Sequence, residues 1–368
     1  MNDGIEPFEI RVDDAALDDL RERLDRTRWP DQIAGTGWEQ GIPVDYTRDL
    51  VAYWRDSYDW REQERRLNEL DHFRTTIDGQ SIHFVHARSA KPDAFPLLLL
   101  HGWPGSFVEF LDVIPRLADS FDVVVPSLPG YGFSEPTRSA GWNTVRIARA
   151  FIELMSRLGY STYGAQGGDW GAQIATRIGA LDPEHCVALH LNMPIATRPE
   201  EKVELSATEK AELAAFAQFQ RHEAAYSLEQ GTKPQTLGVA LSDSPAGLLA
   251  WIVEKFRTWS DCDGDPENVF SRDQLITNVM LYWLTGTVTS SMRLYWEHMH
   301  DDRAQDYVAI PTAVARYPKE ILRFPRSWVA RKYNVTRWTE FERGGHFAAM
   351  EQPEAFARDV QEFFDSLR

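Results

Sequence analysis

An alternation of short apolar runs with amphipathic stretches occupies the middle of the chain, and it limits the possible folds more than any other feature. Apolar runs at Pro96–Leu100, Phe121–Val125 and Cys186–Leu191 are separated by stretches of helical periodicity. Buried strands that alternate with helices are typical of a parallel sheet covered by helices. Asp78-Gly79, between two further strand patterns, predicts a hairpin because both residues tolerate positive φ. The sequence therefore predicts an α/β layer architecture.

Further segments extend this pattern to both ends of the sheet. Other strands are expected at Phe73–Ile77, Ile82–His86, Thr162–Gln166, Tyr307–Ala315 and Val335–Phe341. Helices are expected at Val108–Leu117, Asn143–Leu158, Gly171–Leu181, near Lys319–Leu322, and at Pro353–Leu367. A sheet interrupted only between the strands at Cys186–Leu191 and Tyr307–Ala315 indicates one fold with an insertion.

Two segments do not follow the alternation. Residues 5–70 are mostly helical and amphipathic, broken into a meander by Pro and Gly, and residues 196–303 are helical and rich in aromatic side chains. A helical block between two portions of a sheet is typical of a lid over the active edge. The predicted division is a helical N-terminal region (1–72), a first core part (73–195), the lid (196–303) and a second core part (304–368).

Composition excludes several classes of function. Of the 368 residues 43% are hydrophobic, which excludes a disordered chain. The chain has 39 Lys and Arg residues against 56 Asp and Glu residues, which gives a net charge of −17. Such a surface repels phosphate, so neither nucleic acid nor an anionic membrane is an expected partner. Two cysteines form no disulfide framework. The sequence shows no secretory signal, membrane anchor or long apolar segment, so we expect a cytoplasmic protein.

The strongest local motif is Gly167-Gly168-Asp169-Trp170-Gly171, which lies between a strand and a helix. It has the form of the nucleophile elbow of α/β-hydrolases, with Asp at the nucleophile position. A phosphate-binding turn is the alternative interpretation, but the spacing does not fit G-x-G-x-x-G and Asp repels phosphate. A carboxylate nucleophile displaces at a saturated carbon and forms an ester, whose hydrolysis needs an oxyanion hole and a general base.

The other parts of such a site occur in the expected chain order. His101-Gly102-Trp103-Pro104-Gly105 follows a strand, so the backbone N–H groups of Trp103 and Trp170 are the candidate oxyanion hole. His346, in Arg343-Gly344-Gly345-His346-Phe347, is the candidate base because it follows the last strand. Glu320 is the candidate acid that orients His346. Asp301, Asp302 and Asp306 come before the predicted strand Tyr307–Ala315 and are interpreted as surface residues.

No metal or cofactor motif is complete. The segment His222-Glu223-x-x-Tyr226 lacks the second His of a zinc helix, and His298-x-His300-Asp301 is better explained as a polar lid surface. We therefore predict neither a metal nor an organic cofactor.

At this point the chain resembles the microsomal-type epoxide hydrolases over nearly its whole length. The resemblance rests on the segments His101–Ser106, Pro129–Gly132, Gln166–Gly171, Thr232–Thr236 and Arg343–Ala349. It implies an α/β-hydrolase fold with a mostly parallel eight-stranded sheet, Asp169 as nucleophile, His346 as base and Glu320 as its partner. It also implies two lid tyrosines, Tyr226 and Tyr295, that donate protons to the epoxide oxygen.

The resemblance predicts hydrolysis of an apolar, aromatic or bulky epoxide to a vicinal diol, with water as the second substrate. The family includes enzymes of secondary metabolism, such as enediyne antibiotic assembly, and of detoxification. A haloalkane dehalogenase with the same Asp nucleophile is the alternative enzyme. The alternative outside the enzymes is a binding protein that has the hydrolase fold but no catalytic activity. The sequence leaves the oligomeric state open and is compatible with a homodimer.

Overall fold

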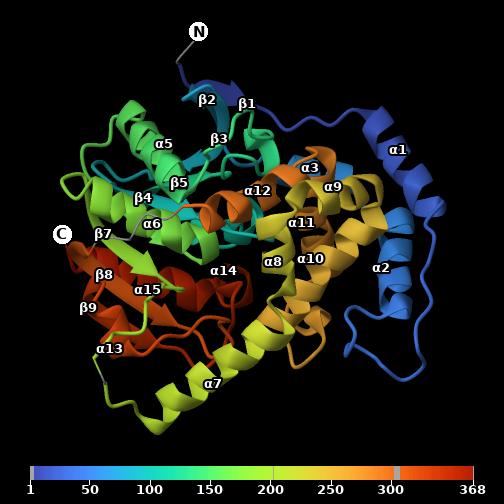
Figure 1. The fold of residues 1–368 in the computed structure, drawn as a ribbon. Helices are drawn as coiled ribbons and strands as arrows, with labels where there is room; N and C mark the ends of the chain where they lie inside the picture. The colour runs from blue at the N-terminus through green and yellow to red at the C-terminus, as the bar shows by residue number, and fades with distance from the viewer. Residues whose placement is uncertain (1–3, 202, 302–306, 368) are drawn as a thin grey trace.

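The computed structural model describes residues 4–201, 203–301 and 307–367, and its strands form one nine-stranded sheet (Figure 1). The strand order is β1-β2-β3-β5-β4-β6-β7-β8-β9. The strands are β1 (Glu6–Phe8), β2 (His72–Ile77), β3 (Gln80–Ala87), β4 (Phe95–Leu100), β5 (Phe121–Pro126), β6 (Tyr163–Gly167), β7 (Cys186–Leu191), β8 (Val308–Arg316) and β9 (Tyr333–Glu340).

The sheet is parallel from β5 to β9 and antiparallel at the β1 edge. The α/β layer architecture and the mostly parallel sheet are thus confirmed, as is the hairpin, in which Asp78 and Gly79 have φ values of 51° and 74°. The predicted number of eight strands is wrong for the described chain. The ninth strand is β1, whose backbone pairs with the start of β2. Three residues with the sequence Glu-Pro-Phe show no alternating pattern that could have predicted it.

Helices cover both faces of the sheet and build the lid. They are α1 (Asp14–Asp25), α2 (Val44–Asp56), α3 (Trp60–Leu67), α4 (Ile114–Ala118), α5 (Thr144–Arg157), α6 (Asp169–Leu181), α7 (Ala207–His222), α8 (Ala225–Thr232), α9 (Pro234–Asp243), α10 (Pro245–Trp259), α11 (Arg272–Leu284), α12 (Val288–Met299), α13 (Arg326–Val329), α14 (Ala348–Glu351) and α15 (Pro353–Asp365). The described residues also form short 3-10 helices at η1 (Phe107–Phe110), η2 (Gly132–Ser134) and η3 (Pro266–Asn268).

Consecutive residues of β7 show how the two layers of helices sit. The side chain of Leu189 faces Gly179 of α6, where an added Cβ would meet its methyl at 3.0 Å. The next residue, His190, faces the opposite layer, and its Nε2 lies 3.0 Å from Asp359 of α15. Because neighbouring side chains of a strand point to opposite faces, α6 and α15 enclose the sheet from two sides. This packing explains why β4 to β8 are almost entirely apolar.

The lid lies over the carboxyl ends of the strands, and the N-terminal helices lie against the lid (Figure 1). Helices α8 and α9 pack on α12, while α1 and α2 pack on α10 and α11. Trp54 of α2 donates its indole N–H to the sulfur of Met280 at 3.3 Å, and Tyr53 donates to Asp273 at 2.9 Å. The apolar stripe of the N-terminal helices is therefore buried on the lid. The four predicted segment boundaries stay predictions.

Two helix predictions are wrong in detail. The stretch Val108–Leu117 is divided between η1 and α4, with Pro115 in the first turn of α4. The stretch Lys319–Leu322 is not helical, because Lys319 forms a bridge to Gly345, with its N–H donating to the carbonyl of Gly344 at 3.1 Å. Asp302 and Asp306, interpreted as surface residues, lie outside the described residues.

Within the described ranges, each helix taken alone is too short or too polar to span a membrane. Helices α9 and α10 reach the required length and composition only as a pair, bent by 116° between them.

A chain of buried histidines joins the sheet to the end of α3. His72 donates through Nε2 to the carbonyl of Leu67 at 2.8 Å, so the Nδ1 of neutral His72 accepts from Nε2 of His83 at 2.9 Å. The free Nδ1 of His83 then accepts from the hydroxyl of Ser127 at 2.9 Å. A proton added to Nδ1 of His72 would face the N–H of His83 and place two donors face to face. Burial lowers the pKa of both histidines, and His83 is shifted well below its usual value.

We predict that the buried pair His72 and His83 lowers the free energy of unfolding as the pH drops from 7 to 5. A histidine whose pKa is lowered by folding stabilises the native state above the unfolded pKa of about 6.5, and this contribution is lost below it. The slope is at most about 1.4 kcal/mol per pH unit for each histidine. Urea unfolding at several pH values measures it, and His83→Gln should flatten the profile. The exposed control His222→Gln should not, and an unchanged slope in His83→Gln would contradict the account.

Candidate active site

The turn between β6 and α6 holds Asp169 in a conformation that few residues adopt. Its φ is 50°, in the left-handed region, which costs about 1 kcal/mol or more for a residue with a side chain. A Cβ at Gly167 would lie 2.3 Å from the carbonyl oxygen of Gly171, and one at Gly171 would lie 2.0 Å from that of Leu100. Only glycine fits at these two positions. The crowded turn therefore raises the carboxylate of Asp169 above the ends of the strands.

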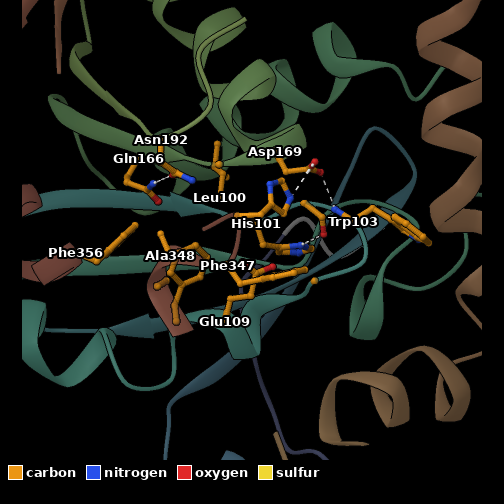
Figure 2. A pocket seen from close by; sticks show the side chains of 16 residues that line it. Leu100, His101, Trp103, Glu109, Gln166, Asp169, Asn192, Phe347, Ala348 and Phe356 are labelled. Carbon is orange, nitrogen blue, oxygen red and sulfur yellow. Dashed lines mark hydrogen bonds and ion pairs between the residues drawn. The ribbon is translucent and has the colours of Figure 1, made fainter. Parts of the chain in front are cut away.

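The loop after β4 brings a backbone donor to this carboxylate. The N–H of Trp103 donates to Oδ1 of Asp169 at 2.8 Å (Figure 2). A Cβ at Gly102 would lie 2.0 Å from the same oxygen, so this glycine permits the close approach. Trp170 is the second residue of α6, directly after Asp169, and its ring packs edge-on against Tyr295 with the ring centroids 4.8 Å apart. Trp103 thus occupies the place expected of an oxyanion donor, and donation by the N–H of Trp170 stays a prediction.

His346 lies between two carboxylates. Its Nδ1 is 2.6 Å from Oε1 of Glu320, and its Nε2 is 3.4 Å from Oδ2 of Asp169. Burial opposes the charged ring, but the charge of Glu320 and the contacts with both carboxylates outweigh it, so the pKa of His346 is raised well above its usual value. The structure therefore brings Asp169, His346 and Glu320 together in one row, in which His346 and Glu320 are buried and Asp169 is half-buried.

The strand-like segment around Glu320 explains how the acid reaches the histidine. The bridge between Lys319 and Gly345 holds the two loops side by side, and the N–H of His346 donates to the carbonyl of Trp259 at 2.9 Å. The N–H of Ile321 donates to Oε1 of Glu320 at 2.8 Å. A helix at this position would not have allowed the bridge.

Two lid tyrosines pack around the loop that carries Trp103. The ring of Tyr226, from α8, stacks on Trp103 at 5.3 Å, and the ring of Tyr295, from α12, meets Trp103 edge-on at 5.9 Å. The two phenol rings are 6.0 Å apart. Burial is the main cause that raises the pKa of both phenols, and the negative charge of Asp169 adds to it. Both phenols therefore remain neutral O–H donors.

Several residues of the site were missed by sequence reasoning. Asn278 of α11 donates to the carbonyl of Pro104 at 2.7 Å and accepts from Ser106 at 2.8 Å, while Tyr282 donates to the carbonyl of Gly105 at 2.6 Å. These lid side chains hold the loop that carries Trp103. No local pattern marks Asn278, because its partners lie more than 170 residues away in the chain.

A small cavity lies next to Asp169, and Figure 2 shows the side chains that line it. The lining combines backbone of the two loops with polar and aromatic side chains. The residues are Leu100, His101, Gly102, Trp103, Gly105, Glu109, Phe110, Gln166, Gly168, Asp169, Asn192, His346, Phe347, Ala348, Ala349 and Phe356. Among the described residues, no group of three His, Cys, Asp or Glu side chains is placed to hold a metal ion.

Comparisons with known proteins agree with this geometry. The family model described as epoxide hydrolase N terminus matches residues 5–110, and the model described as alpha/beta hydrolase fold matches residues 96–237. A protein of Stigmatella aurantiaca is 46% identical, over 99% of this chain and 86% of its own length. Epoxide hydrolase 1 of Sus scrofa is 38% identical, over 100% of this chain and 90% of its own length.

The crystal structure of juvenile hormone epoxide hydrolase from the silkworm Bombyx mori superposes with a TM-score of 0.93. It is 35% identical in sequence, and the match covers 99% of this chain and 95% of that one. The predicted α/β-hydrolase fold is therefore confirmed.

We predict that Glu320→Gln lowers the pKa of His346, because it removes a neighbouring negative charge that favours the imidazolium. NMR titration of the His346 ring, labelled with ¹⁵N, measures the shift. Glu342→Gln, which alters an exposed carboxylate four residues from His346 in the chain, serves as the control. An unchanged titration of His346 in Glu320→Gln would show that Glu320 does not stabilise the charged ring.

Proposed function

The chain belongs to the epoxide hydrolase family, and we propose from this membership and the site geometry that it hydrolyses apolar epoxides to vicinal diols. The observation that carries the proposal is the row of Asp169, His346 and Glu320 beneath two neutral phenols. A carboxylate nucleophile, a base with its acid and two proton donors are the groups that opening a strained ether ring and hydrolysing the resulting ester require.

In the first step a carboxylate oxygen of Asp169 attacks an epoxide carbon and the ring carbon–oxygen bond breaks. The negative charge that develops on the epoxide oxygen takes a proton from the phenol of Tyr226 or Tyr295. Both phenols are neutral at pH 7 because burial and nearby negative charge raise their pKa. The products of this step are an ester at Asp169 and a free hydroxyl group on the neighbouring carbon.

Ester formation also changes the state of His346. The hydrogen bond and charge of Asp169 are two of the causes that raise the pKa of His346, and the uncharged ester removes both. The ring then releases its proton to solvent and the phenolate left by the tyrosine takes one up from solvent, so the phenol is restored before the second step. Neutral His346 becomes a base only after the ester has formed, and Glu320 stabilises the imidazolium that arises in the next step.

In the second step water attacks the carbonyl carbon of the ester while Nε2 of His346 takes its proton. The oxyanion forms on the side chain of Asp169, next to the N–H of Trp103 that already donates to this group. Collapse of the tetrahedral intermediate expels the alcohol oxygen, which takes up the proton from His346. The second proton of the water then passes from the carboxyl group of Asp169 to His346, which restores the carboxylate and the charged ring. One oxyanion donor contributes roughly 10²–10³-fold to the rate in comparable sites.

The lining of the lid supports an aromatic or bulky apolar substrate. The rings of Trp103, Tyr226, Trp259 and Tyr295 form one continuous aromatic cluster next to the row. Such surfaces bind apolar groups and leave a few polar groups to fix their orientation. A panel of racemic epoxides with chiral analysis of the diols distinguishes a narrow biosynthetic substrate from the broad range of a detoxifying enzyme.

The haloalkane dehalogenase alternative is not favoured, because the relatives reported above from Sus scrofa and Bombyx mori are named epoxide hydrolases. The two reactions are separable in one experiment. Diol from styrene oxide with no halide from 1,2-dibromoethane supports the proposal, and the reverse result contradicts it.

We predict that His346→Gln accumulates the ester, because ring opening needs no base whereas hydrolysis does. Mass spectrometry of the protein after incubation with styrene oxide should show one added substrate mass on the peptide that contains Asp169. Steady-state diol formation should fall about 10²–10⁴-fold, the contribution of a general base. The control His346→Gln, Asp169→Asn should carry no adduct. An unmodified Asp169 in His346→Gln would contradict the ester mechanism.

We predict that replacing both lid phenols stops ring opening while the ester of any residual turnover still hydrolyses normally. Each single variant, Tyr226→Phe and Tyr295→Phe, should slow ester formation by up to about 10²–10⁴-fold, the effect of a general acid. Rapid-quench measurements of the first turnover separate the two steps. Tyr53→Phe, which alters a phenol of the N-terminal helices, is the control. Full activity of the double variant would disprove the assignment of the proton donors.

A further inference from the structure

Glu109 is the one carboxylate of the cavity to which the mechanism above gives no role. It lies in the turn η1, directly after the loop that carries Trp103, and lines the same cavity as Asp169 and His346 (Figure 2). A carboxyl group that is buried in the same cavity as a second carboxylate costs free energy of folding. The placement of Glu109 therefore requires an explanation.

The loop is built to admit this carboxyl group. A Cβ at Gly105 would lie 1.5 Å from Oε1 of Glu109 and 2.5 Å from its Cδ, so the carboxyl group fills the space that a side chain at position 105 would need. The carbonyl of Gly105 is itself fixed by Tyr282 of the lid at 2.6 Å. Any residue other than glycine at this position would push the carboxyl group of Glu109 out of the cavity.

The cavity has the size and polarity of a site for one water molecule. It leaves about 20 Å³ that a water molecule can occupy, and a single water needs roughly 10–15 Å³ with two to four polar partners. Asp169, His346 and Glu109 supply such partners. Gln166 lines the same cavity, and its Oε1 is buried without a hydrogen-bond partner among the described residues. An orphaned buried acceptor of this kind indicates a bound water.

Burial, with the charges of Asp169 and Glu320 adding to it against the opposing effect of His346, raises the pKa of Glu109 to about 8. The group is then mostly a neutral carboxylic acid at pH 7. A neutral acid adds no charge beside the oxyanion that forms at Asp169, yet its carbonyl oxygen still accepts a hydrogen bond.

We propose that Glu109 holds the water that hydrolyses the ester. The water gives one hydrogen to Nε2 of His346 and the other to the carbonyl oxygen of Glu109. This leaves a lone pair of its oxygen directed at the carbonyl carbon of Asp169. Glu109 takes no proton in this step, since the proton passes to His346 and then to the departing alcohol oxygen. This role rests on the proposed function, and it makes Glu109 a residue of the second step only.

A second crevice on the other side of Glu109 gives a source for this water. Glu109 also lines a narrow space together with Gln63 and Arg66 of α3 and Gln274 and Thr277 of the lid. Each turnover consumes one water. Because Glu109 borders both spaces, the next water can pass from the crevice into the cavity while the substrate stays bound against the aromatic cluster.

The test separates the two steps in Glu109→Leu and Glu109→Gln with styrene oxide, by rapid quench and mass spectrometry of the Asp169 peptide. Glu109→Leu should form the ester at the wild-type rate, which also shows that it folds. It should then hydrolyse the ester about 10- to 100-fold more slowly, as expected for the loss of one buried hydrogen bond. Glu109→Gln retains a carbonyl oxygen and should hydrolyse the ester within about threefold of the wild type. Asp119→Asn, which alters an exposed carboxylate that lines neither space, should match the wild type in both steps.

The outcomes that contradict the proposal are distinct. Wild-type hydrolysis in Glu109→Leu, or equal slowing in Glu109→Gln and Glu109→Leu, would overturn the role of Glu109 and leave the ester mechanism in place. Absence of any ester in the wild type and in His346→Gln would overturn the proposed function and this role with it.

Discussion

The left-handed conformation of Asp169 is the constraint on which the rest of the site depends. It is possible only because two glycines of the same turn let β6, α6 and β4 approach to distances that exclude a side chain. The turn points one carboxylate out of a packed sheet, within reach of Trp103 on one side and His346 on the other. The energy that holds this strained residue comes from the buried core around it, since loops alone could not maintain it.

The lid covers the site and also fixes the loop that carries Trp103. Asn278 and Tyr282 bind the carbonyl groups of the loop that carries Trp103, and the N-terminal helices in turn bury their apolar face on the same lid helix. The N-terminal segment therefore supports the helix that holds the loop of Trp103. This chain of contacts gives a physical reason for a small helical segment that packs on the lid and lies outside the row of Asp169, His346 and Glu320.

The sequence predicted the parts of the site that local motifs determine. Asp169 and His346 lie in glycine-rich turns after strands, and chain order selected Glu320 even though its segment was wrongly expected to be helical. The bridge from Lys319 to Gly345 replaces that helix, and such a long-range pairing leaves no local pattern. Glu109 was missed for the same reason. A single Glu in a helical stretch gives no sign that a distant cavity encloses it.

The central claim is that an oxygen of Asp169 enters the product. A single turnover of excess enzyme with styrene oxide in water enriched in ¹⁸O tests this most directly, by mass spectrometry of both the diol and the Asp169 peptide. The account predicts an unlabelled diol and one ¹⁸O atom in the carboxylate of Asp169, because water attacks the ester carbonyl. A diol that carries ¹⁸O after the first turnover, with Asp169 unlabelled, would show that water opens the epoxide directly and would contradict the account.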